Sequence, residues 1–179
     1  MGSTYRKLYY SMQLDYARTF GKHEVTALGL FSRLKEARGS MFPIYREDWV
    51  FRLTYNYAMR YFFEANGAYN GSEKFGPDYR FAFFPSLSIG WMISEENFMK
   101  GASNWLSMLK LRTSYGQTGN SNVGYRIYDY YEVGRSAIIG GAESTGVYAS
   151  DLGNKSITWE TTTEFNLGVD FGIFNNRFK

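Results

Sequence analysis

The segment from Ile157 to Ile173, ITWETTTEFNLGVDFGI, alternates apolar and polar residues over nearly its whole length. Its odd-numbered positions are apolar except Thr161 and Thr163, and its even-numbered positions are Thr, Glu, Asn, Asp or Gly. This two-residue period is typical of a β-strand with one apolar and one polar face. Strands of soluble domains average about 5–6 residues, so a regular run this long favours a tilted strand that crosses a membrane and continues beyond it.

Other parts of the chain show the same alternation. The sequence predicts six more two-faced strands, over residues 8–16, 24–34, 49–61, 62–70, 81–93 and 109–116. Pro85 lies inside the fifth of these and predicts a bulge or a local gap in its hydrogen-bond ladder. We expect an eighth strand to start after a turn at residues 174–177.

The connections between these strands alternate between short and long. We expect loops at residues 35–48, 71–79 and 117–156, and turns near Gly21, near Arg60, at residues 95–105 and near Asn175. The segment at residues 94–98 starts with Ser-Glu-Glu and predicts one helical turn. Outer-membrane barrels have short periplasmic turns and longer extracellular loops, so the pattern places the three loops outside the cell.

Aromatic residues make up 20% of the chain, yet its mean hydropathy is −0.38. No window approaches the roughly 18 consecutive apolar residues of a transmembrane helix, which excludes a helical membrane protein but not a barrel. Rings near strand ends suggest girdles at the two membrane interfaces. The candidates are Trp49, Tyr61, Trp91, Trp105 and Trp159. Aromatic residues also favour strands in soluble sandwiches, so that reading stays open here.

The composition argues against catalysis and against nucleic-acid binding. The chain has no Cys, which excludes disulfides and thiolate chemistry, and its single histidine, His23, has no second imidazole near it in sequence. Glu160 and Glu164 would lie about 13 Å apart on one strand face, too far for a glycosidase pair. The net charge of +3 is spread along the chain. We therefore expect no enzyme, no metal, no cofactor and no nucleic-acid partner.

One loop segment could contact a ligand. The stretch at residues 125–132 combines rings, which can stack on sugars or peptides, with charged side chains. The candidate residues are Tyr125, Arg126, Tyr128, Asp129, Tyr130 and Tyr131. The alternative is that these rings pack the loop against its neighbours.

Three ordered blocks resemble a known family. They are AYNGSEKFGPDYRFAFFPSLSIGWMISEENFM at residues 68–99, LKLRTSYGQTGN at residues 109–120 and ITWETTTEFNLGVDFGIFNNRF at residues 157–178. They resemble the C-terminal barrel region of SusC/RagA-type TonB-linked outer-membrane proteins of Bacteroidota, which are TonB-dependent receptors. The blocks consist of strands and turns, so the resemblance carries over no site residues.

The resemblance implies an all-β fold, in which this chain supplies about seven to eight strands of an antiparallel up-and-down transmembrane barrel with 22 strands. It implies a nutrient importer for oligosaccharides or peptides in the outer membrane. The implied partners are a SusD-like surface lipoprotein, outer-membrane lipid, and the TonB-ExbB-ExbD complex acting through a plug domain. We expect residues 1–179 to be part of the barrel domain, with the plug, signal peptide and TonB box absent, because the start MGSTYRKLYYSMQ lacks an apolar leader core.

Two alternatives remain at this stage. One is a small, complete outer-membrane barrel of eight strands that acts as an adhesin or structural protein. The other is a soluble β-sandwich that binds carbohydrate.

Overall fold

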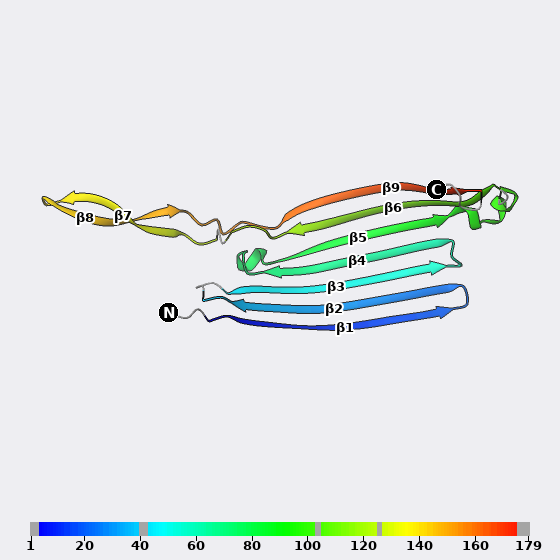
Figure 1. Cartoon of the computed structure of the whole chain (residues 1–179), viewed down its shortest axis with the longest axis horizontal. Helices are drawn as coiled ribbons and strands as arrows, with labels where there is room; N and C mark the ends of the chain where they lie inside the picture. Colours follow the sequence, from blue (N-terminus) through cyan, green and yellow to red (C-terminus); the bar gives the residue numbers. More distant parts are fainter. Residues whose placement is uncertain (1–3, 40–42, 103–104, 125–126, 175–179) are drawn as a thin grey trace.

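A single open sheet dominates the chain. The computed structural model describes residues 4–39, 43–102, 105–124 and 127–174, and seven strands of this part pair in the order β1-β2-β3-β4-β5-β6-β9 (Figure 1). These strands are β1 (Arg6–Phe20), β2 (His23–Ala37), β3 (Ile44–Tyr57), β4 (Tyr61–Ser72), β5 (Phe81–Met92), β6 (Leu106–Asn120) and β9 (Glu160–Ile173). All six pairings between neighbours are antiparallel. The predicted up-and-down antiparallel architecture is confirmed.

The remaining elements lie at the two ends of the sheet. A separate hairpin of β7 (Tyr130–Ile139) and β8 (Ala142–Asp151) extends beyond the sheet at one end (Figure 1). Three short 3₁₀ helices, η1 (Pro77–Tyr79), η2 (Ile93–Glu95) and η3 (Asn97–Ala102), lie in the connections. In the described ranges, no helix combines the length and the apolar character needed to cross a membrane.

The strand register divides the sheet into two chemically different faces. One face, called the outer face, carries the even-numbered residues of β1 and the odd-numbered residues of the other six strands of the sheet. One of its cross-strand rows consists of Val25, Tyr55, Phe63, Ile89, Thr113 and Leu167. The opposite, inner face carries a row of Thr26, Thr54, Glu64, Ser88, Ser114 and Asn166. The alternation seen in each segment therefore lines up across the whole sheet.

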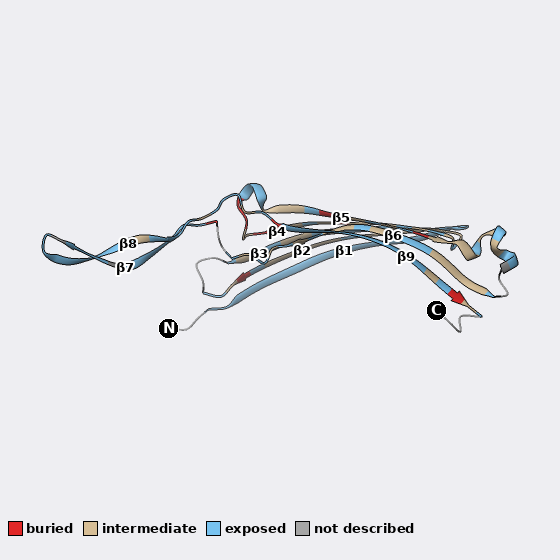
Figure 2. Cartoon of the chain, turned by 90° about the horizontal axis from the view of Figure 1, so that it is seen from above, coloured by how far each residue is buried: buried red, intermediate tan, exposed pale blue. Residues whose placement is uncertain are grey.

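The sheet is curved and has one layer. Figure 2 shows the strands bending across the sheet, and the β7-β8 hairpin extends away from the sheet without packing over it. A sandwich buries its apolar faces between two stacked sheets. In the described residues, the apolar outer face has no second sheet against it, and Leu14, Leu167 and Phe165 are 75%, 69% and 68% exposed. The soluble sandwich alternative is therefore wrong.

Aromatic side chains form two bands on the outer face. Near the short turns, the rings of Tyr57, Tyr61 and Trp91 stack in a row, with centroids 6.2 and 6.5 Å apart. Towards the long loops, Phe31 lies 4.4 Å from Trp49, and the rings of Tyr69 and Phe81 lie 5.1 Å apart. The ten residue steps from Phe81 to Trp91 span about 33 Å of strand, or about 25 Å of membrane thickness at a tilt of ~40°. This spacing matches a lipid-facing band between two interfaces.

Most strands are longer than the sequence predicted, and the predicted loops are correspondingly shorter. β2 continues to Ala37 and β3 starts at Ile44, inside the predicted loop at residues 35–48. The predicted loop at residues 117–156 contains the end of β6 and the whole β7-β8 hairpin. Polar residues occupy both faces there, so alternation is lost although the backbone stays extended. The predicted eighth strand lies outside the described residues.

Pro85 lies at the end of the ladder between β5 and β6 and does not leave the predicted gap or bulge within a ladder. It pairs with Gly67 of β4, but pairing between β5 and β6 begins only at Ser86. No bulge interrupts the register between β4 and β5.

The expected interface position of Trp159 is wrong. β9 begins only at Glu160, and the Trp159 ring is 8% exposed against the rings of Phe75 and Phe84, at 5.0 and 5.4 Å. Its indole N–H donates to the carbonyl of Arg80 at 3.3 Å. The ring therefore fastens the β4-β5 loop to the start of β9, whereas Trp49, Tyr61 and Trp91 lie in the outer-face bands. Trp105 lies at the turn before β6 and is 54% exposed.

Glu96 ties the turns at the other end together. Its Oε1 accepts hydrogen bonds from the Tyr61 hydroxyl at 2.6 Å and the Trp91 indole at 3.2 Å, and its Oε2 lies 3.6 Å from Arg60 Nη1. These contacts connect the β3-β4 turn and the ends of β4 and β5 to the segment that follows η2. The hydrogen bond from Tyr61, then that from Trp91, holds the pKa of Glu96 below its ordinary value.

The two faces predict opposite responses to a charge in the middle of β9. Leu167→Arg places a cation on the lipid-facing side and should reduce membrane insertion, at a cost of about 2–4 kcal/mol near the midplane. Asn166→Arg places the same cation beside Glu164 on the inner face and should be tolerated. Recovery of folded protein from the outer-membrane fraction, judged by heat-modifiable gel mobility, checks both. Equal recovery of the two variants would contradict the assignment of the faces.

The Glu96 contacts predict a pH-dependent contribution to stability. A lowered carboxyl pKa stabilises the folded state at pH values above the ordinary value of 4.5, and this contribution is lost as the pH falls through the lowered pKa. Glu96→Gln should therefore lower the thermal unfolding midpoint at pH 7, and the difference from wild type should vanish in strong acid. Glu95→Gln, at the exposed neighbouring residue, is the matched control. An identical effect of both substitutions at pH 7 would rule out the specific role of Glu96.

Candidate functional site

The inner face presents rows of polar side chains from six strands. One cross-strand row consists of Leu28, Arg52, Asn66, Ser86, Gly116 and Glu164, and it lies next to the row that contains Glu64, Ser88 and Asn166. These positions follow from the two-residue period, because an outward apolar residue leaves the residues before and after it pointing inward. The register then sets hydroxyl, amide and charged groups side by side.

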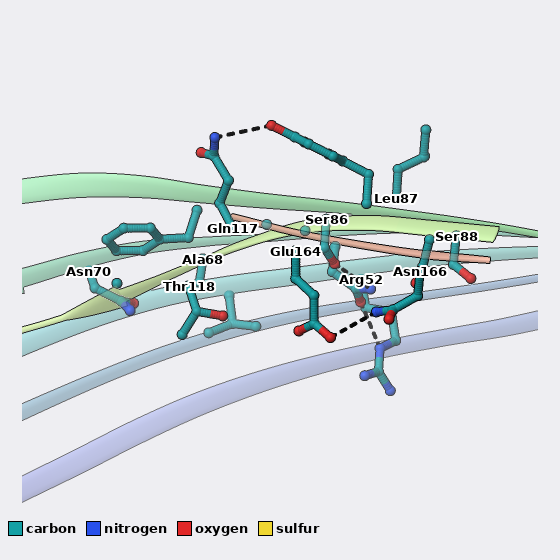
Figure 3. A pocket seen from close by; sticks show the side chains of 18 of the residues that line it. Arg52, Ala68, Asn70, Ser86, Leu87, Ser88, Gln117, Thr118, Glu164 and Asn166 are labelled. Carbon is teal, nitrogen blue, oxygen red and sulfur yellow. Dashed lines mark hydrogen bonds between the residues drawn. The ribbon is translucent and has the colours of Figure 1, made fainter. Parts of the chain in front are cut away.

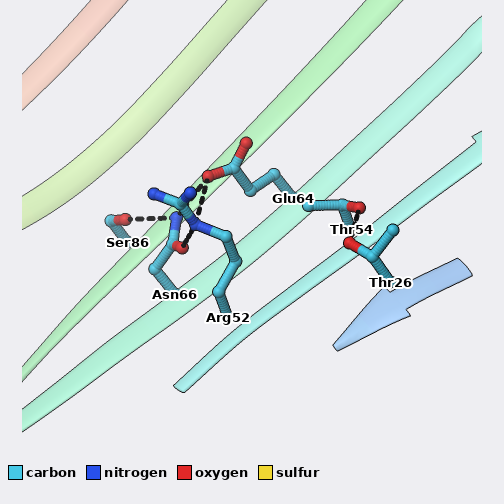
Figure 4. A network of polar contacts seen from close by, with 6 residues as sticks. All are labelled: Thr26, Arg52, Thr54, Glu64, Asn66 and Ser86. Carbon is cyan, nitrogen blue, oxygen red and sulfur yellow. Dashed lines mark hydrogen bonds and ion pairs between the residues drawn. The ribbon is translucent and has the colours of Figure 1, made fainter. Parts of the chain in front are cut away.

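Arg52 is the centre of a polar network on this face (Figure 4). Its Nε donates to Asn66 Oδ1 at 2.8 Å and lies 3.3 Å from Glu64 Oε1. The Asn66 amide donates in turn to Glu64 Oε1 at 2.9 Å and to Ser86 Oγ at 3.3 Å. Four side chains from three strands are thus connected, and the arginine charge has a carboxylate partner.

The polar rows line a hollow of about 690 Å³ (Figure 3). Its lining comes from six strands, from Leu28 on β2 to Glu164 and Asn166 on β9, so the inner face curves around it. Phe84 and Val50 add apolar surface towards the end that carries the long loops. The hollow is therefore a concave wall with both polar and apolar contact surface.

The charges around the hollow are also paired within the wall. Glu164 accepts a hydrogen bond from the Asn166 amide at 2.9 Å, and Arg112 Nε lies 3.1 Å from Asp170 Oδ2. Glu160, nearer the long loops, accepts from the Asn120 amide at 3.0 Å. The predicted orientation of Glu160, Glu164 and Asp170 to the polar side is confirmed. Such a wall can hydrogen-bond to a polar solute or a polypeptide through its amides, hydroxyls and charged groups.

The wall shows no catalytic or metal-binding constellation in the part of the chain that the structure describes. No group of three or more His, Cys, Asp or Glu side chains there could hold a metal ion. His23 lies on β2, where its Nδ1 is 2.8 Å from the Tyr55 hydroxyl and its ring is 4.8 Å from that of Tyr57. The histidine is therefore part of an aromatic band.

The structure places four of the six predicted ligand-contacting residues away from this hollow. Tyr125 and Arg126 lie outside the described residues. The other four, Tyr128, Asp129, Tyr130 and Tyr131, lie at the base of the β7-β8 hairpin, beyond the end of the sheet (Figure 1). Asp129 Oδ1 accepts a hydrogen bond from the Gly153 amide at 2.7 Å, and the Tyr130 carbonyl accepts from Ser150 Oγ at 3.2 Å. These contacts close the hairpin base, and ligand contact by this segment stays a prediction.

The sequence predicts which residues of each strand are on the polar face, but it does not predict the hollow. Arg52, Asn66 and Ser86 belong to three separate predicted strands, and nothing in one strand indicates which residues of the next lie opposite. A signal was present in the short turns, because their length fixes the register of the hairpins they close.

Comparison with known proteins agrees with this architecture. The family described as TonB dependent receptor-like, beta-barrel matches residues 2–179. TonB-dependent receptor SusC of Bacteroides thetaiotaomicron is 39% identical over 130 residues, which cover 70% of this chain and 13% of SusC. TonB-dependent receptor P3 of Formosa agariphila is 36% identical over 129 residues, which cover 72% of this chain and 13% of that receptor.

A solved structure of the RagAB peptide transporter shows the same fold. Its superposition gives a TM-score of 0.77 at 24% identity and covers 97% of this chain and 22% of the transporter chain. This chain spans about 13% of the length of the curated relatives it matches. Since the family match extends over residues 2–179 and the curated relatives share more than a third of the aligned residues, the chain belongs to the TonB-dependent receptor β-barrel family.

Proposed function

We propose that these strands form part of the wall of an outer-membrane TonB-dependent transporter that imports nutrients, either oligosaccharides or peptides. The observation that carries this proposal is the division of one curved sheet into an aromatic outer face and a hydrogen-bonding inner face. Lipid accepts the first face, and water, solute or a protein plug accepts the second. Receptors of this family reside in the outer membrane and act in transport, and nothing about the wall calls for catalysis.

The mixed character of the inner face supports a plug domain inside the complete barrel. An apolar row of Leu30, Val50, Ala68 and Phe84 runs beside the polar rows. Phe84 is already buried against Trp159. Water alone would leave Leu30, Val50 and Ala68 without an apolar cover, whereas a folded plug can cover them and hydrogen-bond to the polar rows. Residues 1–179 then represent part of the barrel domain, and the plug, signal peptide and TonB box belong to other segments of the receptor. The TonB-ExbB-ExbD complex would supply energy through that plug.

The relatives support a role in transport, and one of them supports peptides as a substrate class. SusC is 39% identical to this chain, and the similar fold of RagAB belongs to a peptide transporter. A SusD-like surface lipoprotein is the partner expected at the extracellular end, where the long connections and the β7-β8 hairpin lie. The same relationships support a Bacteroidota-like outer membrane as the location. A complete barrel of eight strands has less support, because the relatives that contain this segment are far longer.

Three consecutive residues of β5 offer a matched test of transport. In the complete receptor, Ser86→Trp and Ser88→Trp place indole rings in the hollow from the inner face and should reduce substrate uptake, because they take up space that a solute or a plug domain would occupy. Leu87→Trp, between them, faces lipid and should leave uptake unchanged. Uptake of labelled oligosaccharides and peptides by cells with equal surface levels of receptor checks this.

A further control tests whether the measured uptake is energised by TonB. Deletion of TonB should abolish uptake by wild type, because the proposed transport is energised. Uptake that survives this deletion, or equal uptake by all three Trp variants, would refute the proposed import through this wall.

A further inference from the structure

The outer face carries a basic patch just beyond its aromatic band. The patch consists of Arg6, Arg33 and Lys35, which all lie on the outer face at the end that carries the long connections. Arg33 is one cross-strand row beyond Phe31, and Lys35 is one row further, so successive rows are about 6.6 Å apart along the strand. The face therefore changes from apolar to aromatic to cationic in the direction that leaves the membrane.

Tyr45 contacts one cation of the patch and lies opposite a second. The guanidinium carbon of Arg33 lies 4.7 Å from the centre of the Tyr45 ring, and Lys35 is the residue directly opposite Tyr45 across the strands. A cation over an aromatic face is held by the ring quadrupole while its N–H groups stay available at the edges. The ring thus positions the Arg33 charge, and the register places Lys35 on the same side of the band.

Glu47 only partly offsets these charges. Its carboxylate accepts hydrogen bonds from the Tyr45 hydroxyl at 2.6 Å and the Trp49 indole at 3.0 Å, and it lies 3.8 Å from Arg33 Nε. Counting three cations and one carboxylate, the outer face here has a net charge of +2. In the cross-strand row of Arg33 and Glu47, β4 and β5 contribute the uncharged residues Gly71 and Phe81. The positive charge is therefore confined to the β1-β3 side of the sheet.

We propose that the basic patch binds the phosphate group of an outer-leaflet glycolipid. This rests on the proposed orientation in the outer membrane, which places the aromatic band at the interface and the patch at the depth of the lipid headgroups. Phosphate is the headgroup chemistry that complements Arg and Lys, and acyl chains can lie along the apolar surface below. Leu8 extends that apolar surface, because it lies directly opposite Lys35 on β1. The patch would thus fix one lipid beside β1.

The test uses the complete receptor that carries these strands, purified in detergent and stripped of lipid. Binding of lipid A, dephosphorylated lipid A and phosphatidylglycerol is titrated by native mass spectrometry. The double variant Arg6→Gln/Lys35→Gln should bind lipid A about 25-fold more weakly, from a loss of roughly fivefold for each cation removed near an anionic membrane surface. Dephosphorylated lipid A should bind wild type as weakly as lipid A binds the variant.

A second double variant controls for net charge. Arg18 lies on the same face of β1 at the opposite end, with its guanidinium carbon 4.8 Å from the Phe20 ring, and Lys22 is in the adjoining turn. Arg18→Gln/Lys22→Gln removes the same charge and should leave lipid A binding unchanged. Equal losses in both double variants, no loss in the first, or phosphatidylglycerol bound as tightly as lipid A would each overturn the proposal. Substrate uptake by the same variants distinguishes failure of this lipid proposal from failure of the proposed transport function, because transport can persist with or without this lipid site.

Discussion

The two-residue period of the strands, held in one register across the sheet, is the constraint on which the structure depends. A slip of one residue between any two strands would turn every side chain of the slipped strand to the other face. In this sheet, such a slip would bring Arg52 or Glu64 to the outer face, where Phe51 and Phe63 lie. A membrane makes the error costly, since lipid offers no hydrogen bonds to displaced charges. Register is therefore what separates the lipid-facing side from the wet side.

The same constraint explains why this chain has so little conventional core. Among the described residues, the buried hydrophobic cluster is small and consists of Phe75, Phe84 and Trp159. It lies at the loop end, where no lipid covers the apolar rings and the protein must bury them itself. Over the rest of the sheet, lipid takes the place of a core on the outer face. The inner face is stabilised by pairing its own charges, as Arg52 with Glu64 and Arg112 with Asp170 show.

Much of the fold could be predicted from the sequence, because alternation is a local signal. The seven main strands, their antiparallel order and the polar side of β9 follow from residue parity and connection length. Strand ends were predicted poorly where polar side chains occur on both faces, as at Lys35 and Glu36 or at Glu47 and Asp48, since a two-residue period of hydrophobicity is then lost. Trp159 continues the parity of β9 but leaves the strand to meet Phe75 and Phe84, a contact over 84 residues of sequence that no local pattern encodes. The inner hollow needed the register between strands, which is a tertiary property.

The most direct test of this account is a scan of solvent and lipid access along β3. The 179 residues contain no cysteine, so single cysteines at residues 49–57 can be spin-labelled one at a time in the complete receptor, after removal of any cysteine elsewhere. The account predicts that collision with oxygen, which concentrates in lipid, peaks at odd-numbered positions such as Phe51 and Leu53. Collision with a water-soluble nickel complex should peak at even-numbered positions such as Arg52. Access that follows no two-residue period, or that favours the opposite parity, would contradict the assignment of the two faces.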